Sequence, residues 1–305
     1  MPAPTFQEEL AVFGPAAQPM PLALPAAQAY CRAFARRHYE NFSVASLLLP
    51  RPLRQHFYNI YAYCRWADNL ADEAGDQARS LDLLRWWETE LDRCYAGQAT
   101  HPVFVALQAT IDEFAIPASP FRDLLVAFRR DQSQTRYATF EQLLEYCRYS
   151  ANPVGHLVLF VGRSHSPQTA RLSDSICSGL QLANHWQDVA RDFQNGRVYL
   201  PQEDRRRCGV DEAMLVRGQA SPEFRQLVQQ QVDRAERMLR DGGPLAGMVA
   251  PALRRQIRLF QGGGLAILNE IRRANYDVLA RRPTVSRWQQ ARLLAGVWLS
   301  RGDRA

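Results

Sequence analysis

The chain has 305 residues, of which 47% are hydrophobic and 10% aromatic, enough for one large folded domain or two ordinary ones. Its net charge of +6 is compatible with an anionic substrate, an anionic membrane surface or nucleic acid. Because no apolar stretch approaches about 18 residues and no secretory leader is found, we expect neither a membrane-spanning nor a secreted protein.

Taken in order, the chain begins with residues 1–25, which hold six prolines and are interpreted as a loosely held N-terminal extension. From residue 26 to 305 the apolar residues recur with a helical period, so we predict a single all-α domain. Helices are expected at 27–39, 51–73, 81–96, 101–115, 120–135, 139–150, 153–163, 167–194, 222–241, 245–261, 263–281 and 285–300. Ser80 is taken as the start signal of the third helix and Gly97 as its stop.

Two interruptions stand out in this helical pattern. The stretch Ala151-Asn152-Pro153 is expected to kink or restart a helix, because proline cannot continue the backbone hydrogen-bond ladder. The triplet Gly262-Gly263-Gly264 is interpreted as close helix packing or a bend, in preference to a phosphate-binding loop.

The first acidic face lies within 51–73. On a helical wheel Tyr61, Arg65, Asp68 and Asp72 share one side, opposite an aromatic and apolar side. Two aspartates four residues apart repel each other, at a cost to the helix of about 0.2–0.5 kcal/mol. Such a face attracts a cation.

A second acidic face lies within 167–194, where Gln181, Asn184, Asp188 and Asp192 share one side. A single pair of aspartates at this spacing usually lies on a solvated helix face. Here the pattern occurs twice, each time in an apolar helix that is expected to be central to the core. Two such helices facing each other would place four carboxylates around one space.

Four aspartates suit Mg²⁺, a hard ion that takes oxygen ligands and is often bound together with substrate phosphates. A di-iron bundle would need Glu-x-x-His motifs, and no histidine of this chain follows an acidic residue at that spacing. A nucleotide-binding P-loop motif is absent as well.

These motifs resemble those of the squalene/phytoene synthase family. The similarity lies in Arg65-x-x-Asp68-x-x-x-Asp72-Glu73 and in Gln181-x-x-Asn184-x-x-x-Asp188-x-x-x-Asp192, followed by Gly196–Pro201. It covers roughly residues 28–290. The resemblance implies one all-α isoprenoid-synthase domain with a central cavity between helices.

Within the family, 41–50, 146–155 and Asn184–Asp188 look most like the hydroxysqualene synthases of bacterial hopanoid biosynthesis. Condensing members usually have Val-Ala-Gly where this chain has Ser150-Ala151-Asn152. They also have Arg, which helps to bind diphosphate, where this chain has Gln187.

The resemblance implies a lyase that ionises presqualene diphosphate with Mg²⁺ and captures the rearranged cation with water, giving hydroxysqualene and diphosphate. By family position, the metal ligands would be Asp68, Asp72, Asn184, Asp188 and Asp192, and the diphosphate contacts Ser43, Tyr61, Arg65, Gln181, Arg197 and Tyr199. Phe42 and Tyr146 would stabilise the cation, with core packing as the alternative for Phe42. Asn152 or Tyr146 would position the water.

Two other functions stay open at this point. One is a transferase that condenses two prenyl diphosphates head to head, as squalene and phytoene synthases do. The other is a non-catalytic helical adaptor or a nucleic-acid binder. The second is disfavoured because Arg205–Arg207, the one short basic run, follows two acidic residues and is interpreted as a solvated loop.

The six scattered cysteines are typical of reduced thiols in a cytosolic protein. We therefore expect a cytoplasmic location, with peripheral attachment at the inner face of the cell membrane as an option. The expected partners are an isoprenoid diphosphate and other hopanoid-pathway enzymes, and no nucleic acid. The segment Trp288–Trp298 is interpreted as a packing helix, with a membrane-surface helix as the alternative.

Overall fold

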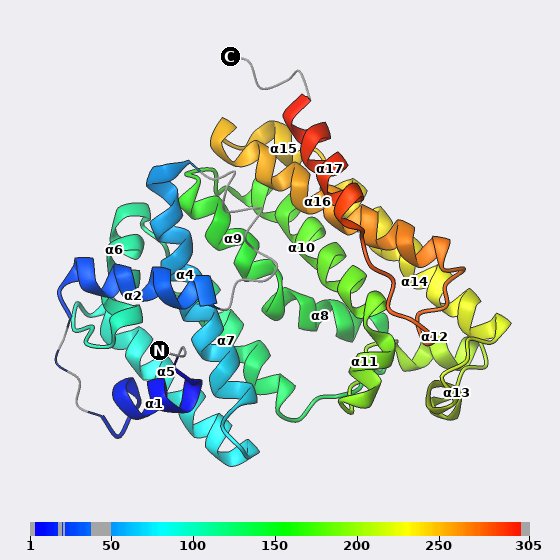
Figure 1. The fold of residues 1–305 in the computed structure, drawn as a ribbon, viewed down its shortest axis with the longest axis horizontal. Helices are drawn as coiled ribbons and strands as arrows, with labels where there is room; N and C mark the ends of the chain where they lie inside the picture. The colour runs from blue at the N-terminus through cyan, green and yellow to red at the C-terminus, as the bar shows by residue number, and fades with distance from the viewer. Residues whose placement is uncertain (1–3, 18–19, 21, 38–49, 300–305) are drawn as a thin grey trace. The chain divides into compact units, whose positions relative to one another are not determined.

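The computed structural model describes residues 4–17, 20, 22–37 and 50–299, which form helices joined mostly by short connections (Figure 1). The chain divides into two compact units. The first comprises Met1–Ser133 and His156–Arg163, and the second comprises Gln134–Gly155 and Ser164–Ala305. The expected all-α class is confirmed, and the β-structure of the described residues is a single bridge between Arg136 and Val198. No linker in the sequence signals the division into two units.

The first unit is built around one long helix, α4. Its helices are α1 (Phe6–Phe13), α2 (Leu24–Arg37), α4 (Arg51–Asp72), α5 (Gln77–Tyr95), α6 (Pro102–Phe114), α7 (Ser119–Asp131) and most of α9 (Asn152–Val161). Helix α4 packs against α2, α5, α6 and α7. The cap of α5 is Asp76 and not Ser80, whose hydroxyl instead donates to the carbonyl of Ala71 at 3.0 Å. Gly97 ends α5 as predicted, with φ at 73°.

Helix α1 departs from the expected loose extension. Thr5 and Glu8 form a capping box at its start, and the Phe6 ring lies 5.0 Å from that of Trp66. The expectation of a loosely held segment is therefore wrong for Phe6–Phe13. The prolines that suggested it lie outside this helix, so they do not oppose it.

Fully buried aromatic rings form the core of the first unit. Trp66 and Trp87 are stacked 5.3 Å apart, and the His101 ring meets both edge-on at 4.7 and 4.9 Å. His101 accepts a hydrogen bond from Val103 N through Nδ1, whereas its Nε2 is buried with no hydrogen-bond partner among the described residues. Burial lowers the pKa of His101 to about 3, so the ring is neutral in the native protein.

This neutral histidine should make the protein acid-sensitive. The folded-state pKa of His101 lies below the unfolded value of about 6.5. The contribution of the neutral ring to the free energy of unfolding is therefore fully present above pH 6.5 and is lost as the pH falls toward 3. Each pH unit in that window costs about 1.4 kcal/mol per such histidine.

The variant His101→Asn keeps a side-chain cap but has no group that titrates in this range. Between pH 6 and pH 5 we expect its free energy of unfolding to fall by about 1.4 kcal/mol less than that of the parent protein. Urea unfolding at both pH values measures this difference, and the same pair at pH 8 gives the packing loss alone. Parallel stability–pH curves would contradict the prediction.

The second unit is organised around α10. Its helices are α8 (Phe140–Ser150), α10 (Pro167–Gln187), α11 (Val189–Gln194), α12 (Gln202–Arg207), α13 (Glu212–Arg217), α14 (Pro222–Asp241), α15 (Leu245–Met248), α16 (Pro251–Arg273) and α17 (Arg287–Leu299), together with the start of α9. Helix α10 packs mainly against α14 and α16. The expected break at Ala151–Pro153 is confirmed, because α8 ends at Ser150 and α9 begins at Asn152.

The helices of this unit differ from the sequence prediction at several places. Helix 167–194 is divided at Asp188, and the short helices α12 and α13 were not expected. The predicted helices 245–261 and 263–281 are replaced by α15 and a continuous α16, since the chain restarts at Pro251 and runs through the three glycines.

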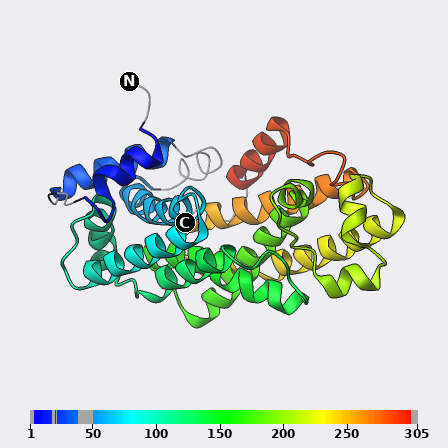
Figure 2. The same ribbon diagram turned by 90° about the horizontal axis from the view of Figure 1, so that it is seen from below.

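Close packing explains one of those glycines, as expected. A Cβ at Gly264 would lie 2.8 Å from Leu180 Cδ2 and 3.0 Å from Leu239 Cδ1, so glycine lets α16 approach α10 and α14 without displacing these side-chain ends. Helix α17 packs along α16 (Figures 1 and 2), in agreement with the packing interpretation, and the Trp288 side chain at its start is 87% exposed. Among the described helices none is long and apolar enough to cross a bilayer.

Candidate active site

In the first unit, the predicted acidic face is present on α4. The Arg65 guanidinium donates to the Asp68 carboxylate at 2.6 Å, and both side chains are 37% exposed. Partial burial raises the pKa of the Tyr61 hydroxyl, an effect opposed by Arg65 and reinforced by Asp68. Asp72 is exposed at the end of the helix. The other predicted residues of this region, Phe42 and Ser43, lie outside the described residues.

In the second unit, the second motif spans the junction of α10 and α11. Gln181 is half-buried and Asn184 exposed, both on α10. Asp188 is the residue at which α10 ends and α11 begins, and Asp192 N donates to the Asp188 carbonyl at 2.8 Å. The side chains of Asp188 and Asp192 are 18% and 22% exposed, so both carboxyl groups are largely withdrawn from solvent.

Asp192 is electrostatically the most perturbed acid of the site. Burial, and then the neighbouring carboxylate of Asp188, raise its pKa to about 7, against the opposing effect of Arg197. The buried His185 lies beside it, with Nδ1 4.0 Å from Asp192 Oδ2. Burial lowers the pKa of His185 to about 3, so this ring supplies no positive charge near neutral pH.

His185 belongs to an aromatic cluster that also contains Tyr137, Tyr146 and Tyr199. The ring of Tyr199 stacks on His185 with centroids 3.6 Å apart and lies 5.7 Å from Tyr137. Tyr146 lies 5.5 Å from Tyr137 and 5.9 Å from Tyr199. The cluster therefore joins two predicted site residues, Tyr146 and Tyr199, and fixes the segment that carries Tyr199 next to the acidic motif.

The segment 196–201, which carries Arg197 and Tyr199, is held by backbone hydrogen bonds to 135–138. Val198 N donates to the Thr135 carbonyl, and Gln202 N donates to that of Tyr137, each at 2.9 Å. Within the segment, the Leu200 carbonyl accepts from Arg205 Nε at 3.2 Å. Arg205 is 7% exposed, so the solvated-loop interpretation of Arg205–Arg207 is wrong for this residue.

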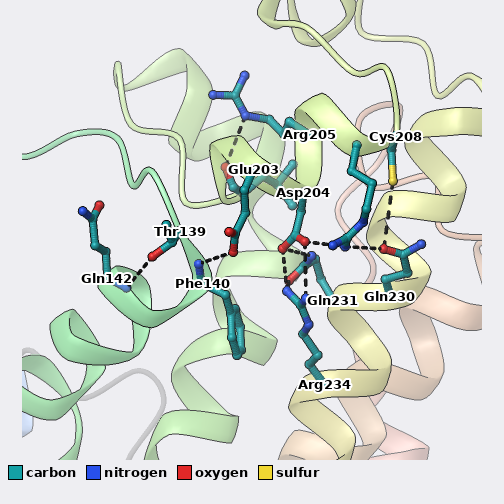
Figure 3. A network of polar contacts seen from close by, with 12 residues as sticks. Thr139, Phe140, Gln142, Glu203, Asp204, Arg205, Cys208, Gln230, Gln231 and Arg234 are labelled. Atoms are coloured by element: carbon teal, nitrogen blue, oxygen red, sulfur yellow. Dashed lines mark hydrogen bonds and ion pairs between the residues drawn. The ribbon is translucent and has the colours of Figure 1, made fainter.

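Helix α12, which follows this segment, is anchored by the fully buried Asp204. Figure 3 shows its carboxylate facing Gln231 and Arg234 of α14, whose donors lie 2.8 and 2.5 Å away. Arg207 donates to the same carboxylate at 2.5 Å. The Arg234 guanidinium also lies 4.4 Å from the centre of the Phe140 ring. Because one carboxylate holds three donors, α12 is fixed on α14, and the segment that carries Tyr199 is fixed with it.

Asn152, predicted to help position water, is 8% exposed at the start of α9. Its amide oxygen accepts a hydrogen bond from the Ser178 hydroxyl of α10 at 2.9 Å. One end of the amide is thus oriented by α10, which also carries the acidic motif.

Two residues near the acidic motif were not predicted as contacts. Arg282 pairs with the carboxylate of Asp188, although it lies far along the chain. Gln187, which the sequence marks only as a departure from relatives, is buried and bonds both Arg282 and the carbonyl of Pro283. No spacing or periodicity in the sequence predicts that the end of α10 contacts the segment Arg282–Pro283.

The donor set suits a magnesium ion. The acidic residues and Asn184 supply oxygen ligands, and burial followed by the neighbouring Asp188 raises the pKa of Asp192, so a cation would stabilise its charged form. Among the described residues, no group of three or more acidic, histidine or cysteine side chains is already gathered in a metal-binding arrangement. The proposed ligand set stays a prediction.

A model of the squalene/phytoene synthase family matches residues 35–289. The chain belongs to this family. It is therefore an enzyme of a family that acts on isoprenoid diphosphates and typically uses Mg²⁺.

Three relatives show how the chain relates to other family members. It is 46% identical to the squalene synthase HpnC from Alicyclobacillus acidocaldarius, whose crystal structure superposes with a TM-score of 0.80 over 83% of this chain and 95% of that one. It is 36% identical to the hydroxysqualene synthase of Rhodopseudomonas palustris, over 69% of this chain and 71% of the relative. It is 32% identical to a phytoene synthase of Arthrospira platensis, over 85% and 88%. The isoprenoid-synthase fold expected from the sequence is confirmed.

Proposed function

We propose that this family member is a hydroxysqualene synthase, which converts presqualene diphosphate and water into hydroxysqualene and diphosphate. The observation that carries the proposal is Gln187, which stands where condensing relatives have a diphosphate-binding Arg. Its amide is already engaged by Arg282 and Pro283. The similarity to the Rhodopseudomonas palustris hydroxysqualene synthase supports it.

In this proposal the carboxylates of Asp68, Asp72, Asp188 and Asp192, with Asn184, bind Mg²⁺. When held by these residues, the ion would supply Lewis-acid stabilisation of the leaving diphosphate. Tyr61, Arg65, Ser43, Gln181, Arg197 and Tyr199 orient that group, and a guanidinium is well suited to its oxygens because it donates through a planar fork. Breaking the carbon–oxygen bond leaves a cyclopropylcarbinyl cation in the substrate.

The remaining residues control what happens to that cation. The aromatic faces of Tyr146 and Phe42 stabilise positive charge, an effect worth about 2 kcal/mol when it is desolvated. Asn152 and Tyr146 position the water that forms the new carbon–oxygen bond. That water loses one proton, so the reaction yields hydroxysqualene, diphosphate and H⁺.

The second candidate is a condensing transferase, which the similarity to a phytoene synthase favours. Purified protein with Mg²⁺ is incubated separately with farnesyl, geranylgeranyl and presqualene diphosphate in ¹⁸O-labelled water. We expect turnover of presqualene diphosphate alone, with ¹⁸O in the hydroxysqualene. Turnover of farnesyl or geranylgeranyl diphosphate alone would overturn the proposal in favour of the transferase.

Replacing Asn152 with Gly should change the product and leave ionisation largely intact. Without its amide, the water is no longer positioned, so the hydroxysqualene share of the products should fall several-fold. Glycine removes the acceptor of the buried Ser178 hydroxyl, which costs about 1–3 kcal/mol of stability, so circular dichroism must first show that the variant is folded. Gas chromatography measures the products, and diphosphate release measures ionisation, which should stay within about twofold.

Ser178→Ala is the matched variant for Asn152, because it removes the hydroxyl that orients the amide and leaves the amide in place. We expect a smaller shift of products in the same direction. An unchanged hydroxysqualene share in Asn152→Gly would show that Asn152 does not position the water.

A further inference from the structure

Arg282 forms a two-point contact with Asp188, the acid at the junction of α10 and α11. Its Nε donates to Asp188 Oδ1, and its Nη2 lies 3.0 Å from Oδ2. This is the planar fork by which arginine engages both oxygens of one carboxylate. The contact lies wholly within the second unit.

The fork is supported by a buried side chain. Gln187 is 5% exposed; its amide oxygen accepts from Arg282 Nη2 at 2.9 Å, and its amide nitrogen donates to the Pro283 carbonyl at 2.6 Å. Both ends of one amide therefore tie the segment Arg282–Pro283 to the end of α10. A surface arginine that met Asp188 by chance would lack this support.

The charges around Asp188 set the electrostatic balance. The negative groups are Asp188 and Asp192, and the positive groups that act on Asp192 are Arg191, Arg197 and Arg282. Arg282 engages the carboxylate of Asp188 directly. Because each carboxylate oxygen has more than one lone pair, the Arg282 fork does not fill Asp188, but its positive charge opposes a cation that approaches the same two oxygens.

We propose that Arg282 gates the metal site of the second motif by competing with Mg²⁺ for Asp188, and that Gln187 is the residue that positions it. This inference rests on the proposed function, since that function assigns Asp188 to the metal. When the ion binds, the guanidinium turns away from Asp188. Gln187 here carries out a different task from the arginine of condensing relatives: it holds a guanidinium from another segment.

The test is the affinity of the full-length protein for Mn²⁺, used as a paramagnetic substitute for Mg²⁺ and titrated without substrate. Free Mn²⁺ is measured by electron paramagnetic resonance. We expect Arg282→Gln to bind Mn²⁺ about five- to tenfold more tightly than the parent chain, because no charge-assisted fork has to be broken. Arg282→Lys should lie between them, since an ammonium group cannot form the fork.

Arg281→Gln is the matched control, because it removes the same charge from an exposed neighbouring residue. It should change Mn²⁺ affinity by less than about twofold. If both variants bound Mn²⁺ equally more tightly, the effect would come from net charge alone and the gate would be overturned. Unchanged or weaker Mn²⁺ binding in Arg282→Gln would overturn it as well. A parent chain that binds no Mn²⁺, with or without inorganic diphosphate, would instead overturn the metal site of the proposed function.

Discussion

Replacing Asp192 with Asn is expected to reduce diphosphate release from presqualene diphosphate by about 10²–10³-fold, the effect of losing one stabilising group at the reacting centre. Asparagine keeps the shape of the side chain but cannot neutralise a divalent ion. Since Asp192 is largely buried beside Asp188, solvent does not replace the missing charge. Steady-state diphosphate release at saturating Mg²⁺ measures the loss.

Two observations separate this loss from unfolding. The thermal unfolding midpoint of the Asp192→Asn variant should not fall at pH 8, because the amide carries no charge that burial would penalise. The matched variant Asp233→Asn, on α14 in an ion pair with Arg272, should retain activity within about twofold. Near-normal turnover in Asp192→Asn would remove this residue from the ligand set.

The largest expected loss of stability follows from replacing Asp204 with Ala. The carboxylate is fully buried and holds Gln231 and Arg234, so its removal leaves buried donors without an acceptor. Breaking a pair of this kind costs about 3 kcal/mol or more. Urea unfolding monitored by circular dichroism should show this decrease.

The exposed pair of Asp82 and Arg85 provides the control for Asp204. Both side chains are largely exposed, and Asp82→Ala should change stability by less than about 0.5 kcal/mol. Combining Asp204→Leu with Arg234→Met should recover part of the loss, because the Arg234 charge is removed together with its partner, while Gln231 and Arg207 still lose their acceptor. Equal losses for the Asp82 and Asp204 variants would mean that the buried network does not hold α12 in place.

The acidic face of α4 could be predicted because it depends on local geometry alone. Residues four apart share a helix face wherever the helix forms, and the contact between Arg65 and Asp68 follows from their spacing. The capping box of Thr5 and Glu8 was equally local and readable. The prolines on either side of it favour an extended segment instead, and this makes the prediction for residues 1–25 wrong at α1.

Contacts between distant segments could not be predicted in this way. Gln187 directly precedes Asp188 in the chain, but its partners Arg282 and Pro283 lie beyond α16, and only tertiary packing brings them to the end of α10. The burial of Arg205 has the same origin, because a run of arginines looks solvated until a carbonyl acceptor is placed beside one of them. The end of α10 at Asp188 has neither glycine nor proline to signal it.

The division of α9 between the two units has a consequence for synthesis on the ribosome. The first unit includes His156–Arg163, and Arg163 bonds the Glu113 carbonyl and lies over the Phe114 ring. The ribosome must therefore synthesise the beginning of the second unit before the first is complete. We expect a nascent chain that ends near Ser133 to stay sensitive to protease, and protection to appear only after Arg163 has left the exit tunnel.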